Sequence, residues 1–126
     1  MGLMTWLSGC LPGKPGLSDV NRAIEEAPGV TASDLTRGPG GGLGKNFQGS
    51  VSLDVPGPEL RSALDGAWKR GVEVIRSMDD VPDTTYADAV HGVAADGTKM
   101  FVRELLGPDA PAAPMLAQFY EHYGLH

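Results

Sequence analysis

The chain has 126 residues, 41% of them apolar, which suits one domain with a single modest core. It carries 16 acidic and 10 basic side chains, a net charge of -6, and the basic residues are scattered apart from the pair Lys69 and Arg70. We expect no nucleic-acid partner, because no cationic patch is present to neutralise phosphates. No stretch approaches the roughly 20 consecutive apolar residues that a membrane-spanning helix requires.

The only cysteine lies in the N-terminal segment MGLMTWLSGCLPGKPG. Leu7-Ser8-Gly9-Cys10 resembles the lipobox of bacterial lipoprotein precursors: Leu, a small residue, Gly or Ala, then Cys. The resemblance implies that Cys10 is acylated, that the residues before it are removed, and that the Pro- and Gly-rich stretch up to residue 17 forms a tether. Residues 1–9 contain no Lys or Arg, so this interpretation expects the signal to begin upstream of Met1. The alternative is a cytoplasmic protein in which Cys10 is an apolar filler.

A short amphipathic helix is predicted from Ser18 as its N-cap to the pair Pro28-Gly29. Its apolar positions recur at helical spacing, and Asp19 is favourably placed in its first turn. Residues 30–37 are predicted to form a strand. From Phe47 to Val55 apolar and polar residues alternate, which is typical of a half-buried strand and makes this the clearest strand in the chain.

Between these two strands lies the glycine-rich stretch RGPGGGLGKN. Glycines can let backbone N–H groups converge on an anion, but the spacing does not fit a phosphate loop, and a strand follows where such a loop needs a helix. We expect a hairpin connection. Lys45 and Asn46 at its end are the candidate binding residues of the sequence.

A second, long helix is predicted to start near Pro58 and to continue to the acidic segment SMDDVPD. Gly71 leaves open the alternative that this helix stops early and that VEVI forms a strand. The pair Asp96-Gly97 predicts a hairpin turn between strands over 84–94 and 98–105. A final helix is predicted over MLAQFYEH near the end of the chain.

The predicted order, helix-strand-strand twice and then a helix, indicates an α+β two-layer sandwich with the helices on one face of an antiparallel sheet. We expect residues 1–17 to be the signal remnant and tether and residues 18–126 to be one domain. The stretch AIEEAPGV and the strand after it resemble the ferredoxin-like heavy-metal-associated domains over about residues 20–55. The resemblance implies a ferredoxin-like topology, and a duplicated α-β-β unit is the alternative. It implies no metal site, because SDVN stands where those domains have two cysteines.

The remaining candidates for chemistry favour structural roles. Asp79, Asp80 and Asp83 lack the spacing of a calcium loop, and His122 and His126 are four apart but close to the chain end. His91 has no nearby serine or cysteine to activate, and Trp68 lies on the apolar face of its helix. We expect no catalytic residues, no metal and no cofactor.

Two functions remain. The first is a lipid-anchored binding domain of the bacterial cell envelope, held on the membrane through Cys10, with an envelope protein as a candidate partner. The Leu-Ser-Gly-Cys box and the Ala, Gly, Pro, Asp and Arg bias together resemble lipoproteins of GC-rich actinobacteria. The second is a cytoplasmic ferredoxin-like module that binds a ligand or regulates. The sequence identifies neither the ligand nor the oligomeric state.

Overall fold

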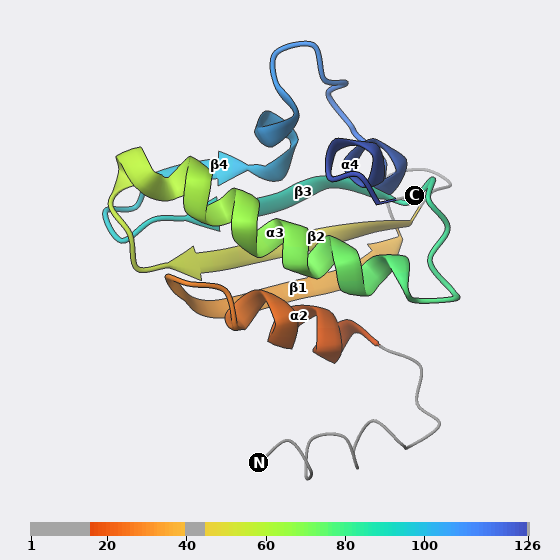
Figure 1. Cartoon of the computed structure of the whole chain (residues 1–126), viewed down its shortest axis with the longest axis horizontal. Coiled ribbons are helices and arrows are strands. Elements are labelled where there is room, and N and C mark those ends of the chain that lie inside the picture. The colour runs from red at the N-terminus through yellow and green to blue at the C-terminus, as the bar shows by residue number, and fades with distance from the viewer. Residues whose placement is uncertain (1–15, 40–44, 126) are drawn as a thin grey trace, which may run out of the picture.

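The computed structural model describes residues 16–39 and 45–125. The elements follow the predicted order, in which each of the first two helices is followed by two strands and a third helix ends the pattern α-β-β-α-β-β-α (Figure 1). They are α2 (Leu17–Glu25), β1 (Val30–Pro39), β2 (Lys45–Leu53), the 3-10 turn η1 (Gly57–Glu59), α3 (Leu60–Arg76), β3 (Tyr86–Val93), β4 (Lys99–Phe101), the 3-10 turn η2 (Val102–Leu106) and α4 (Leu116–His122).

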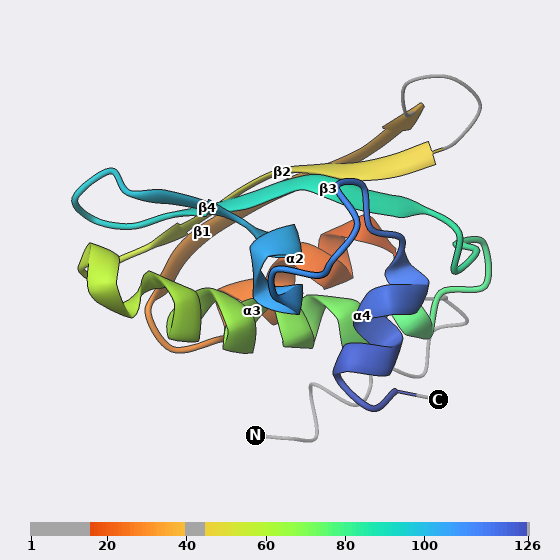
Figure 2. The same cartoon turned by 90° about the horizontal axis from the view of Figure 1, so that it is seen from above.

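The four described strands form one sheet in the order β1-β2-β3-β4, and the three described α-helices lie on one side of it (Figure 2). The α+β two-layer sandwich is therefore confirmed. The prediction of an antiparallel sheet is wrong for the central pair, because β2 and β3 run parallel while the two outer pairs are antiparallel. The reason is the connection: α3 carries the chain back along the sheet, so β3 starts at the same end as β2. The element order is that of the alternative, a duplicated α-β-β unit. The ferredoxin-like topology is not confirmed.

The core lies between the sheet and the helices. Trp68 and Phe119 are fully buried and meet edge to face, with ring centroids 5.5 Å apart, an arrangement that aromatic pairs favour. Trp68 is thus a core residue, as predicted. β2 supplies Phe47, Val51 and Leu53 from its inward face, which confirms the alternation found in the sequence.

The long second helix is also confirmed, since α3 continues through Gly71 to Arg76. Gly71 permits close packing of the two helices: a Cβ there would lie 2.7 Å from Cδ1 of Ile24 on α2. A glycine that looked like a helix breaker in the sequence therefore fits the α2–α3 contact.

Two predicted boundaries need correction. Ser18 is not the N-cap of α2; Gly16 is, and its backbone N–H donates to the Asp19 carboxylate at 2.8 Å. The second strand of the Asp96-Gly97 hairpin is only three residues long, because the chain turns into η2 and buries Val102 and Leu105 in the core. The hairpin itself forms as predicted.

The outer edge of β1 is covered by side chains of α2. Asn21 Oδ1 accepts from the Leu35 backbone N–H at 2.9 Å, Asn21 Nδ2 donates to the Leu35 carbonyl at 3.2 Å, and Glu25 accepts from the Ser33 N–H at 3.1 Å. A strand edge with unpaired backbone groups can pair with another chain. These contacts satisfy the middle of that edge and make it a poor place for strand addition.

The C-terminal turn is fastened to α3. The Tyr123 hydroxyl donates to Asp65 Oδ1 at 2.7 Å. Burial and this hydrogen bond raise the pKa of Tyr123 above the ordinary tyrosine value of about 10. Because the folded state favours the neutral phenol, this contact stabilises the protein below about pH 10 and is lost as the pH rises further.

We therefore expect Tyr123→Phe to lower the free energy of unfolding by about 1 kcal/mol at neutral pH. The variant should also lose less stability than the wild type between pH 9 and about pH 11. Urea denaturation at both pH values measures the two effects. Part of the alkaline loss should remain, because burial also raises the pKa of Tyr120. Equal alkaline losses in the two proteins would contradict this account of Tyr123.

Candidate functional site

The structure does not gather the residues that the sequence singled out. Cys10 lies outside the described residues. Lys45 begins β2, and its side chain is not among those described. Asn46 lies between Gly38 of β1 and Tyr86 of β3, and its Oδ1 is buried without a hydrogen-bond partner. The predicted strand context after the glycine-rich stretch is confirmed, so a phosphate loop has no helix here to support it.

The acidic turn is held by a structural ion pair. Arg37 donates to the Asp80 carboxylate at 3.0 Å and to the Asp80 carbonyl at 2.6 Å, and its guanidinium lies over the Phe47 ring. Within residues 16–39 and 45–125, no group of three His, Cys, Asp or Glu side chains is placed to hold a metal ion. The same part of the chain contains no helix long and apolar enough to cross a bilayer.

His91 lies on the sheet face that no described helix covers. It is paired with Ser50 of β2 and Phe101 of β4, and its ring is 5.3 Å from that of Phe101. Its Nδ1 is buried without a hydrogen-bond partner. The surroundings of His91 are therefore those of a packed residue of the sheet.

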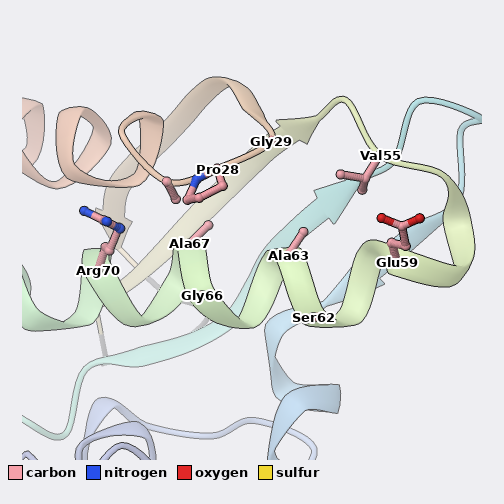
Figure 3. Close-up of a pocket in the computed structure, with 10 residues that line it drawn as sticks. Pro28, Gly29, Val55, Glu59, Ser62, Ala63, Gly66, Ala67 and Arg70 are labelled. Atoms are coloured by element: carbon pink, nitrogen blue, oxygen red, sulfur yellow. The ribbon is translucent and has the colours of Figure 1, made fainter.

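The structure instead shows a groove between the α2–β1 turn and the N-terminal half of α3 (Figure 3). Its volume is about 470 Å³, which is within the usual range for small-molecule sites. One wall is the turn after α2, the other is the exposed side of α3, and Val55 lies near one end, just after β2. The lining residues are Ala27, Pro28, Gly29, Val55, Glu59, Ser62, Ala63, Gly66, Ala67 and Arg70.

The shape of the groove follows from local sequence. Gly29 has a φ of +86°, which permits the tight turn after α2, and its carbonyl accepts from the Asp54 N–H at 2.7 Å. This bond ties the turn to the end of β2. On α3 the residues that face the turn are small, so the two walls remain apart where larger side chains would fill the space.

Gly66 is an unusual residue for this position. It is exposed in the interior of α3, and a Cβ added to it would have no heavy atom within 4 Å. A helix-interior glycine costs about 0.5–1 kcal/mol relative to alanine. Unlike Gly71, Gly66 has no contact in the described structure that would require a glycine.

Charged side chains stand at the two ends of the groove. Figure 3 shows the Glu59 carboxylate at the end near Val55 and the Arg70 guanidinium at the end near Pro28. Glu59 is the N-cap residue of α3, yet its side chain makes no capping hydrogen bond. Its charge complements the helix dipole, and no hydrogen bond joins its carboxylate to another of the described residues.

Comparisons with protein-family models, with curated proteins and with solved structures find no match to the chain. The chemistry of the groove is therefore inferred from its own residues. Small apolar side chains form its floor, and one carboxylate and one guanidinium mark its ends. This arrangement can hold an apolar or peptide-like body and orient it by its polar groups.

Sequence reasoning missed the groove. In the sequence, Pro28-Gly29 predicts a helix end, which is correct but does not reveal the wall that these residues form. One signal was present: Gly66, in the middle of a strongly periodic helix, needed an explanation. The groove itself joins residues from the α2–β1 turn, the end of β2 and α3, and their proximity depends on the packing of α2 against α3.

Proposed function

We propose that the protein is a binding domain of the bacterial cell envelope, anchored through a lipid on Cys10, that takes a small ligand in the groove between the α2–β1 turn and α3. It acts by binding and not by catalysis. The observation that carries the binding site is Gly66. A residue that lowers helix stability without easing an internal contact is best explained by a ligand that approaches the helix backbone closely.

The proposed location at the cell envelope rests on the lipobox resemblance at residues 7–10. The chain enters the described domain at Gly16, next to α2, and the groove lies at the other end of α2, beside the turn after that helix. A tether of Pro and Gly ahead of residue 16 would thus hold the domain on a membrane and leave the groove open to ligands.

The groove is tested by substitutions at Gly66. Gly66→Ala should raise the free energy of unfolding by about 0.5–1 kcal/mol, and Gly66→Leu should fill the groove without destabilising the fold. In two-dimensional NMR spectra, fragments with an apolar body and one polar group should shift the resonances of Ala63, Gly66 and Ala67. These shifts should vanish in Gly66→Leu.

Two variants serve as controls. Arg61→Leu places the same side chain at an exposed position of α3 outside the groove and should leave fragment binding unchanged. Gly71→Ala should lower stability, because its Cβ would press against Ile24. Fragment shifts that persist in Gly66→Leu, or a loss of stability in Gly66→Ala, would contradict the proposed site.

A further inference from the structure

The side chains at the two ends of the groove have no partners among residues 16–39 and 45–125. Neither the Glu59 carboxylate nor the Arg70 guanidinium forms an ion pair or a side-chain hydrogen bond with another of the described residues. Both project into the groove in Figure 3. The groove therefore offers an acceptor of hydrogen bonds at one end and a planar, bidentate donor at the other.

The distance between these two groups sets the length of a ligand that contacts both. Arg70 follows Glu59 by eleven positions in the sequence, which corresponds to about 16 Å along a helix. An extended peptide advances about 3.3 Å per residue. A chain of about four residues therefore fits between the two charges.

The floor between the charges restricts the side chains of the ligand. Ala63 and Ala67 are the side chains that point toward the turn, and Gly66 exposes helix backbone between them (Figure 3). Pro28 and Val55 add apolar surface on the opposite wall and at one end. Such a floor accepts the main chain and small side chains, but it offers no deep pocket for a large one.

We infer that the ligand of the groove is a short extended peptide of about four small residues with free termini, its ammonium group at Glu59 and its carboxylate at Arg70. This inference rests on the proposed function and adds the class and the direction of the ligand. Opposite charges at opposite ends fix that direction, since a reversed peptide would place like charges together at both ends.

The test uses alanine peptides with free termini and the full chain. Tetra-alanine should shift the groove resonances in NMR titrations and bind more tightly than di-alanine, which is too short to reach both charges. N-acetyl-tetra-alanine amide, which has the same length but no terminal charges, should bind at least about fivefold more weakly. Binding should also weaken as salt is added.

Substitutions separate the two ends. Glu59→Gln and Arg70→Gln should each weaken tetra-alanine binding about three- to tenfold and should leave the binding of the capped peptide unchanged. Arg61→Gln, an exposed arginine of the same helix outside the groove, is the matched control and should change neither.

Three results would overturn the inference. Equal binding of the free and capped peptides would show that the charges do not select the ligand. Fragment binding at Gly66 without any binding of tetra-alanine would refute the peptide class but leave the proposed groove intact. If the groove resonances shift with protein concentration alone, a second copy of the chain covers the groove, and both the ligand class and the proposed site are wrong.

Discussion

Gly49→Ala is expected to destabilise the protein by at least about 3 kcal/mol, the largest effect of any single methyl group that we expect here. Gly49 lies in the middle of β2, opposite Leu35 of β1. Its φ is +128°, a conformation that side chains rarely adopt, and a Cβ would overlap the carbonyl oxygen of Asp34. The added methyl meets backbone, so no rotation of a side chain relieves it.

The size of this effect can be judged against the stability of a domain. A domain of this size is typically stable by about 5–15 kcal/mol, so the variant should be marginal or unfolded at 37 °C. Urea denaturation followed by circular dichroism and by the fluorescence of buried Trp68 measures the loss.

Gly97→Ala is the matched control. Gly97 also has a positive φ, +90°, but nothing lies within 4 Å of its Cβ. Its substitution should cost only the backbone strain, about 1–2 kcal/mol. Similar losses in the free energy of unfolding of the two variants would contradict this prediction. They would show that the strands at Gly49 move apart at little cost and that the overlap with β1 does not destabilise the protein.

Cys10→Ala is expected to abolish the acylation and the cleavage of the precursor completely when it is expressed in its own host. Each buried CH₂ of an acyl chain contributes about 0.8 kcal/mol, so two or three chains suffice to hold an acidic domain on a bilayer. The wild-type protein should lose every residue before Cys10, and the variant should stay uncleaved by the lipoprotein signal peptidase.

The mass of the mature amino terminus decides this prediction. A mass equal to an acylated Cys10 in the membrane fraction supports the lipid anchor. An unmodified Cys10 in the aqueous fraction, with the preceding residues retained, would contradict it and favour the cytoplasmic alternative. The binding tests on the groove are independent of this result, because they do not require a lipid on Cys10.

Local patterns in the sequence were sufficient to predict which segments form helices and which form strands. The alternation after Phe47 predicts β2 because only one face of that strand meets the helices. The spacing of apolar residues predicts α3 as a long helix, and Asp96-Gly97 predicts the β3–β4 hairpin because Gly97 takes a positive φ. Each of these features depends on residues that are neighbours in the chain.

Only the tertiary structure decided how the strands pair and where the groove lies. The parallel pairing of β2 and β3 depends on the crossover through α3. The order strand-helix-strand allows such a crossover, but patterns within single elements do not show which strands pair. Likewise, the length of β4 depends on Val102 and Leu105 turning into the core. Gly71 lets α2 approach α3, whereas Gly66 lines the groove and a Cβ there would meet nothing within 4 Å. Two glycines of one helix thus have different surroundings, and the sequence alone cannot distinguish them because the difference lies in what packs against each.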